Sequence, residues 1–256
     1  MNGDLKLDSK LFAFYSMIKA STRKGIINKK FWMVILVIIF ISGVMGYAAT
    51  QESHGFDEGS DLLDFLVISF FLPLITMIFG SSIISDEIED KSITHVLISP
   101  LNRTNIYVGY FISLILISVI AMVLIITSGF LTYFGIIGLN LDALQIYLSM
   151  VSLVIIGSVI YSSIFILVSI LIEKPLYFGL FYVFIWESFI GSLPGKVKLV
   201  SIRHYIRSVG KELIDYGSIA NYGEASGLFS SIQALSIIIL ILLILGIVLF
   251  NNKEFP

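Results

Sequence analysis

The 256-residue chain is strongly apolar: hydrophobic residues fill 57% of its positions and charged residues 13%, with a mean hydropathy of +0.98. A soluble protein of this size carries about a quarter of its residues as Asp, Glu, Lys and Arg, so a fully water-exposed surface is excluded. Cysteine is absent, which excludes disulfides and thiolate metal sites. The polar start of the chain precedes the first apolar run at Phe31 and is not expected to be a cleavable signal peptide.

Six apolar stretches are long enough to cross a bilayer, which takes about 20 mainly apolar residues in a helix. They cover residues 31–49, 62–84, 106–137, 144–172, 175–193 and 232–250. The third and fourth are longer than a bilayer requires, so we expect tilt or protruding ends. The fifth is short and contains Glu187, so a re-entrant segment is the alternative to a span. The sequence therefore predicts an all-α, polytopic membrane protein with six transmembrane helices in one domain, 1–256.

Lysine and arginine are unevenly distributed between the predicted loops. Seven of them precede the first span, whereas residues 50–61 contain none. Because cytoplasmic loops carry an excess of Lys and Arg, we expect a multi-pass protein of the cell membrane with both termini in the cytoplasm. The five cations within 195–231, on the predicted outer side, depart from this pattern.

Residues 10–28 predict a helix at the membrane interface. Leu11, Tyr15 and Ile18 repeat at helical spacing, with Phe14 beside them. The cations of this stretch are Lys10, Lys19, Arg23 and Lys24. A basic amphipathic helix binds the anionic cytoplasmic leaflet and the bilayer interface. The alternative is a tail that only fixes the orientation of the first span.

The predicted cytoplasmic loop after the second span, 86–104, begins with a cluster of acids. The carboxylates are Asp86, Glu87, Glu89 and Asp90. Asp86 with Glu89 has the spacing of a capping box, and an apolar stripe follows that comprises Ile93, Val96, Leu97 and Leu101. A short amphipathic helix of this kind suits docking to a partner protein. The alternatives are a solvated helix start or carboxylate chemistry, for which no nucleophile or pocket is visible.

The long loop before the last span, 195–231, predicts an amphipathic helix at the outer interface. One stripe holds Ile202, Ile206, Val209 and Leu213, and a second holds Arg203, Arg207 and Lys211. Glu187 stands near the outer end of the fifth span, where an acid needs a partner, and Arg203 and Arg207 are the candidates. Such a pair would act as an outer gate or would only pin the loop.

Motifs for catalysis are missing from the sequence. It contains no G-x-x-x-x-G-K-[ST] phosphate loop, no H-E-x-x-H and no G-x-S-x-G. His54, His95 and His204 fall on different predicted sides of the membrane, and the spans hold almost none of the ionisable residues that ion-coupled carriers use. We therefore expect no enzyme activity and no catalytic, cofactor or metal site in this chain, with energy supplied from outside it.

The basic N-terminus, the six spans and the D-E-I-E-D-K-S…L-I-S-P-L-N-R segment resemble the type-2 ATP-binding-cassette (ABC) transporter permeases. In that family the loop reads as acidic residues followed by L-x-x-S-P-x-x-R. Ser99, Pro100 and Arg103 fit this pattern, with Leu97 one position closer to Ser99 than in the pattern, whereas Ile93-Thr94-His95 departs from it. Trp186-Glu187 and the segment 201–205 are also similar to a subset of these permeases.

The resemblance implies that two six-span permeases, two copies or a copy and a paralogue, pair and that each docks an ABC ATPase subunit. That partner would use ATP and Mg²⁺. The segment after the second span would be the coupling helix, and the loop 195–231 would form short re-entrant helices. Members are mostly exporters, which makes an exporter permease the expected function.

The alternatives to this reading are a non-transporting membrane anchor or assembly factor and, below it, a secondary carrier. A membrane-embedded enzyme would need polar catalytic groups inside the bilayer, and the sequence offers none. The expected partners are the ATPase, the second permease and the lipid bilayer, with no nucleic acid. The substrate is not readable from the sequence.

Overall fold

The structure, a computed structural model, describes residues 2–51, 55–89, 101–187, 189, 195–223 and 225–253. These residues form helices, with no strand among them. Within the described parts of the chain, five helices are long and apolar enough to cross a membrane. The prediction of an all-α polytopic protein is confirmed.

The helices follow one another along the chain with short connections. They are α1 (Asn2–Ile27), α2 (Phe31–Ala49), α3 (Phe56–Leu63), η1 (Asp64–Phe71), α4 (Leu72–Ile83), α5 (Ser85–Glu89), α7 (Arg103–Ile137), α8 (Leu141–Leu171), α9 (Pro175–Phe181), η2 (Tyr182–Glu187), η4 (Gly195–Val200), α10 (Ile202–Lys211), α11 (Gly217–Ala220) and α12 (Leu228–Asn252).

The predicted spans agree closely with the long helices. The first coincides with α2, and the third, fourth and sixth lie almost entirely within α7, α8 and α12. With 35 residues α7 is about 50 Å long, well beyond the hydrocarbon thickness of about 30 Å. The expected excess length of the third and fourth spans is therefore present as continuous helix.

The second span is one continuous helical path from Phe56 to Glu87. Its middle segment, η1, is a π-helix, which widens the turn just before α4. Because the helical register changes at Phe71, Pro73 stands in the first turn of α4, where its missing N–H is tolerated. The π-helix thus accommodates the proline without breaking the span.

The described helical part of the fifth predicted span, expected over 175–193, runs from Pro175 to Glu187. Its α-helical part, α9, has seven residues and its π-helical part, η2, has six. Together these two described segments extend at most about 20 Å, against a hydrocarbon thickness of about 30 Å; of residues 188–193 only Phe189 is described. Pro175 opens α9 in the predicted first-turn position.

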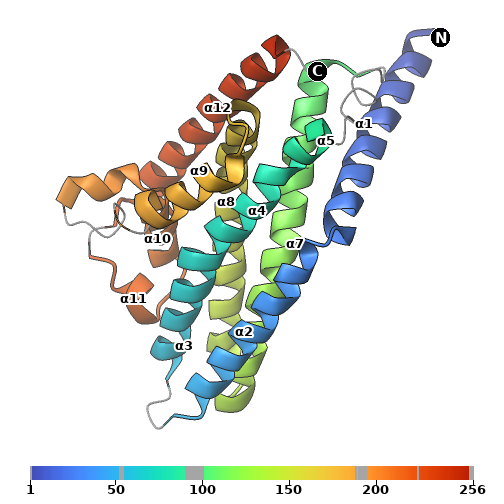
Figure 1. Cartoon of the computed structure of the whole chain (residues 1–256). Coiled ribbons are helices and arrows are strands. Elements are labelled where there is room, and N and C mark those ends of the chain that lie inside the picture. The colour runs from blue at the N-terminus through green and yellow to red at the C-terminus, as the bar shows by residue number, and fades with distance from the viewer. Residues whose placement is uncertain are drawn as a thin grey trace.

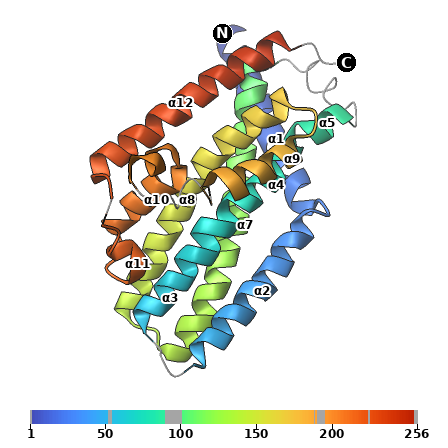
Figure 2. The ribbon, with the colours of Figure 1, turned by 60° about the vertical axis from the view of Figure 1, so that its left-hand side comes forward.

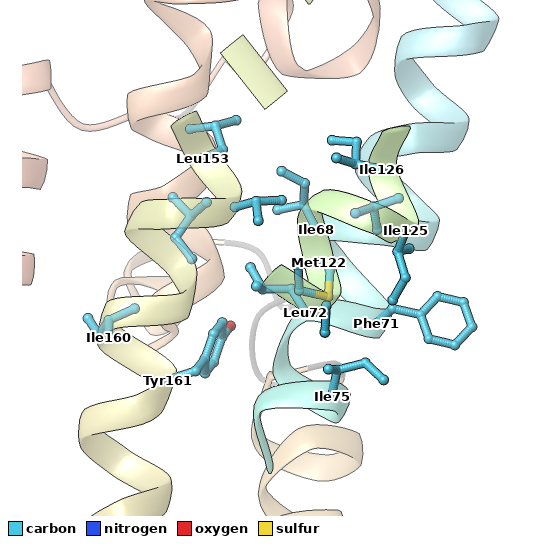
Figure 3. Close-up of a cluster of buried hydrophobic side chains, with 14 of the residues drawn as sticks. Ile68, Phe71, Leu72, Ile75, Met122, Ile125, Ile126, Leu153, Ile160 and Tyr161 are labelled. Atoms are coloured by element: carbon cyan, nitrogen blue, oxygen red, sulfur yellow. The ribbon is translucent and has the colours of Figure 1, made fainter. Parts of the chain in front are cut away.

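The core lies between the second span, α7 and α8. Figure 3 shows Ile68, Leu72 and Ile75 facing Met122 and Ile125 of α7 and Tyr161 of α8. Most of the apolar window of α8 is buried, whereas α2 and α12 bury only a small part of theirs. These two helices therefore present most of their apolar surface outward, as expected of lipid-facing helices.

Two glycines allow α4 and α8 to approach closely. A Cβ added at Gly80 would lie 2.5 Å from the Cβ of Phe165, and one added at Gly157 would lie 2.3 Å from Leu72 Cδ2. Small residues permit such close approach of helices in membranes. Gly43 on α2, by contrast, has nothing within 4 Å of the added Cβ.

Both chain ends lie at the same end of the helical bundle (Figure 1), which we call the terminal end. The α5 segment and the start of α7 lie at this end too, whereas the turns after α2 and α7 lie at the opposite, far end. The helices α10 and α11 pack beside α3, α8 and α12.

The N-terminal helix α1 begins earlier than the predicted 10–28 helix and packs along α7. The Ser113 hydroxyl of α7 donates a hydrogen bond to the Ile18 carbonyl at 3.3 Å. The predicted apolar stripe is divided, because Ile18 is half-buried while Leu11 and Tyr15 are exposed. A basic, partly apolar face of α1 is thus left for another surface, and its contact with the membrane interface stays a prediction.

Candidate functional site

Two groups of charged side chains in the described part of the chain join separate helices. The first, the α10 charge cluster, comprises Asp64, Glu187, Arg203 and Arg207 around the helix that was predicted in the loop 195–231. The second, the terminal-end acids, comprises Asp86 and Glu87. The predicted apolar stripe of α10 packs inward, since Ile202, Ile206 and Val209 are buried.

Glu187 binds the start of α10. It is only 1% exposed, and it ends the π-helical segment η2. Its carboxylate accepts hydrogen bonds from Ser201 Oγ at 2.6 Å, Ile202 N at 3.1 Å, Arg203 N at 3.3 Å and the Tyr182 hydroxyl at 2.9 Å. An anion is favoured at a helix N-terminus because the first N–H groups have no partner within the helix. Glu187 therefore fixes the start of α10 to the fifth apolar helix.

Asp64 holds the middle of α10. Its side chain is buried, and its Oδ2 is ion-paired with Nη2 of Arg207. The guanidinium of Arg207 also lies over the Tyr222 ring, 5.9 Å from its centroid. Because Asp64 is the first residue of η1, this ion pair joins α10 to the second span.

Of the two arginines predicted to pair with Glu187, Arg203 contacts it, through its backbone N–H. The carboxylate is held by hydroxyl and backbone N–H groups, and Arg207 pairs with Asp64 instead. Within the described residues, Oδ1 of Asp64 and the Nε atoms of Arg203 and Arg207 are buried without a hydrogen-bond partner. The cluster is balanced, with two acids and two arginines, so its buried charges compensate one another.

His204, in α10, forms hydrogen bonds with the segment between α11 and α12. Its Nδ1 is 2.8 Å from the Tyr222 hydroxyl and its Nε2 is 2.9 Å from Ser226 Oγ. Burial, and then the charge of Lys198, lowers the pKa of His204. The imidazole is therefore neutral at neutral pH, with one nitrogen donating and the other accepting. His54 and His95 lie outside the described residues.

The terminal-end acids are bound by lysines from the start of the chain. Asp86 Oδ2 is 2.7 Å from Lys30 Nζ, and Glu87 Oε1 is 2.8 Å from Lys24 Nζ. Asp86 lies in the first turn of α5 and both its oxygens bind Lys30; the side chain of Glu89, its partner in the predicted capping box, lies outside the described residues. The acidic loop head is thus connected to α1 and to the start of α2.

Arg103 also has a partner inside the chain. Its Nη1 donates to the carbonyls of Asn251 at 3.0 Å and Lys253 at 3.1 Å, at the end of α12. Lys253 in turn donates from Nζ to the Ile170 carbonyl at the end of α8. Cations at helix C-termini satisfy the last free carbonyls. These bonds tie the ends of α7, α8 and α12 together.

Several residues predicted for partner docking lie outside the described residues. They are Asp90, Ile93, Val96, Leu97, Ser99 and Pro100; of Glu89 only the backbone, in α5, is described. Asp86, Glu87 and Arg103 are described, and all three make the contacts above. Their docking role stays a prediction.

The second span carries the terminal-end acids and one member of the α10 charge cluster, Asp64. The helix α3, which Asp64 follows, and α5, which holds the terminal-end acids, lie at opposite ends of the path from Phe56 to Glu87 (Figure 2). Among the residues that the structure describes, no three His, Asp or Glu side chains are grouped so that they could hold a metal ion. The arrangement suits mechanical connection between two ends of a membrane bundle.

Comparison with known proteins identifies the family of the chain. A protein-family model described as "ABC-2 family transporter protein" matches residues 15–255, nearly the whole chain. A comparison with curated proteins gave no match. The matched range includes every long apolar helix and both charged groups, as the multi-pass permease component of a transporter requires. The chain therefore belongs to the ABC-2 transporter family.

Proposed function

We propose that this chain is the permease subunit of an ABC exporter, forming the translocation pathway together with a second copy or a paralogue. A separate ABC ATPase docks at the segment 86–104 and supplies the energy by using ATP and Mg²⁺. The terminal end of the bundle then faces the cytoplasm, and α10 lies toward the outer side. Membership of the ABC-2 family supports the permease role, and the excess of cations before α2 supports the orientation.

The observation that carries the proposal is the continuous helix of the second span. Its 32 residues extend about 48 Å, from α3 to the acids that precede the proposed docking segment. The π-helical turns and Pro73 are the points at which this helix can bend, and both lie between the terminal-end acids and Asp64 or next to it. A displacement at Asp86 and Glu87 is therefore passed along α4 to η1, and from Asp64 through Arg207 to the helix α10.

Within this proposal, Glu187, Arg203 and Arg207 pin the outer loop to the bundle. Glu187 accepts from the backbone of α10 itself, so α10 follows any movement of α9–η2. Asp64 links the same helix to the second span. Because α10 is bound both to α9–η2 and to the second span, it moves when these two elements move relative to each other.

The first experiment is affinity purification of the tagged full chain from its native membranes in mild detergent, followed by mass spectrometry. A stoichiometric ATPase with a phosphate loop supports the proposal. Its repeated absence under several gentle conditions contradicts the proposal and favours an anchor or assembly role.

The charge-reversed triple variant Glu87→Lys, Glu89→Lys, Asp90→Lys tests the docking segment. We expect it to insert into membranes but to lose ATPase capture and transport. Because Glu87 also pairs with Lys24, the double variant Glu87→Lys, Lys24→Glu is the matched control that restores the internal pair. Full capture by the triple variant would rule out docking through these acids.

A further inference from the structure

The α10 charge cluster contains two arginines on one helix, and its acid Asp64 pairs with only one of them. Arg203 and Arg207 stand four residues apart on α10, so their side chains lie on the same face of the helix. Asp64 Oδ2 is ion-paired with Arg207, whereas Asp64 Oδ1 is buried without a hydrogen-bond partner. The acid therefore keeps one unused acceptor inside the cluster.

Arg203 is the arginine whose side chain lacks an acceptor. It is half-buried, and within the described part of the chain its guanidinium forms no ion pair and its Nε no hydrogen bond. Burial, and then the charge of Arg207, lowers the pKa of Arg203, and Asp64 is the first of the groups that act in the opposite direction. A guanidinium withdrawn from water is stabilised by a carboxylate partner. Asp64, with its unused oxygen, is able to supply one.

The other acid of the cluster, Glu187, is already occupied at the start of α10. Its two oxygens accept four hydrogen bonds, from the hydroxyls of Tyr182 and Ser201 and from the backbone N–H groups of Ile202 and Arg203. A carboxylate offers about four lone-pair sites, so the acceptor capacity of Glu187 is used. Glu187 therefore holds Arg203 by its backbone and not by its guanidinium, and the first turn of α10 is a fixed point.

The second half of α10 holds the segment that leads to α12. The guanidinium of Arg207 lies over the Tyr222 ring, and Lys211 Nζ donates a hydrogen bond to the Tyr222 carbonyl at 3.1 Å. The ion pair between Arg207 and Asp64 connects this half of α10, and with it Tyr222, to the second span. Loss of that ion pair would loosen the second half of α10, while Glu187 would keep the first turn in place.

We propose that Asp64 exchanges its partner between Arg207 and Arg203, and that this exchange is a latch on the second half of α10. With Arg207 bound, as in the structure, the whole helix is fastened to the second span. With Arg203 bound, the acid is paired close to the fixed first turn, and the residues from Arg207 onward are released. The two ion pairs define two discrete states, because packed elements switch between arrangements instead of deforming continuously. The latch requires only the fold, so it depends neither on the ATPase nor on transport.

Hydrogen exchange of the purified full chain in detergent tests the latch, with the amides of 207–211 and 221–223 as the readout. Arg207→Met removes the present partner of Asp64, so these amides should exchange faster. Arg203→Met removes the alternative partner, so the same amides should exchange about threefold slower or more than in the parent. A merely structural role of Arg203 predicts the opposite, because the loss of a stabilising residue accelerates exchange. Equal or faster exchange in Arg203→Met would overturn the proposal.

Melting temperatures give a second, independent measurement. If Arg203 takes over the acid, Asp64→Asn should still lower the melting temperature of the variant Arg207→Met, and should no longer lower that of Arg203→Met, Arg207→Met. An effect of Asp64→Asn that vanishes as soon as Arg207 is replaced contradicts the exchange. Arg23→Met, at an exposed arginine of α1, is the matched control and should leave the hydrogen exchange of α10 unchanged.

Discussion

Asp64 and Arg207, 143 positions apart in the chain, form an ion pair that fastens α10 to the second span. The carboxylate is buried, whereas the guanidinium is partly exposed beside Tyr222. Neither residue belongs to a recognisable motif, and the pairing arises only when the loop 195–231 folds back on the bundle. It is the most direct link between this loop and the helix that leads to the terminal-end acids.

Asp64→Asn should destabilise the protein strongly. The substitution leaves Arg207 without its counter-charge, and breaking a buried ion pair by removing one partner costs up to about 3–5 kcal/mol. Thermal unfolding in detergent, followed by the fluorescence of Trp32 and Trp186, measures the effect. The double variant Asp64→Asn, Arg207→Met should recover part of the loss, and Glu212→Gln, an exposed acid in the same region, should change little.

Glu187→Gln should loosen the start of α10. A glutamine offers one carbonyl acceptor in place of two charged oxygens, so bonds from Ser201, Ile202 and Arg203 cannot all be kept. Each charge-assisted bond is worth about 1.5–3 kcal/mol. Hydrogen exchange of the amides in α10 should accelerate, while the amides of α7 keep their protection. Equal protection of α10 in the variant and the parent would contradict the anchoring role of Glu187.

Gly80→Ala should lower the melting temperature, because the new methyl group would meet Phe165 at 2.5 Å in the close contact of α4 and α8. Overpacking of this kind costs about 1–3 kcal/mol. Gly43→Ala, where nothing lies within 4 Å, is the matched control and should leave the protein equally stable or slightly more stable. If both variants melt alike, the tight packing at Gly80 is refuted.

Acidification should weaken the protein through His204. Since burial lowers the pKa of this imidazole below its ordinary value of 6.5 in the folded state, the unfolded chain binds the proton more readily. The contribution of the neutral His204 to the free energy of unfolding is then fully present above pH 6.5, and it is lost as the pH drops through the folded-state pKa. Melting temperatures between pH 8 and pH 5 should decline less in His204→Gln than in the parent. Parallel curves would exclude His204 as the titrating group.

The long helices could be predicted from sequence because bilayer thickness sets their length. Residues 31–49 match α2, and the stripe of Ile202, Ile206 and Val209 correctly predicted the buried face of α10. Both signals are local: each depends on hydrophobicity summed or repeated over a single helix. The family resemblance, which drew on the loop motif and the hydropathy together, is confirmed by the match over residues 15–255.

The parts that could not be predicted depend on contacts between distant segments. The π-helical turns of η1 and η2 have the same apolar composition as ordinary helix. Glu187 proved to bind two hydroxyls and two backbone N–H groups, and the direction of these N–H groups is set by where α10 begins. A signal for the Lys24–Glu87 and Lys30–Asp86 pairs did exist, because cations before the first span and acids after the second were predicted on one side.

The π-helical turns of η1 restrict how the length of the second span can change in evolution. Each residue of an α-helix turns the chain by about 100°, so deleting one residue between positions 64 and 71 would convert the wide turn to an α-turn and rotate α3 against α4. Asp64 would then face away from Arg207. Homologues with a shortened second span should therefore have lost both members of this pair together, or carry the acid one position away.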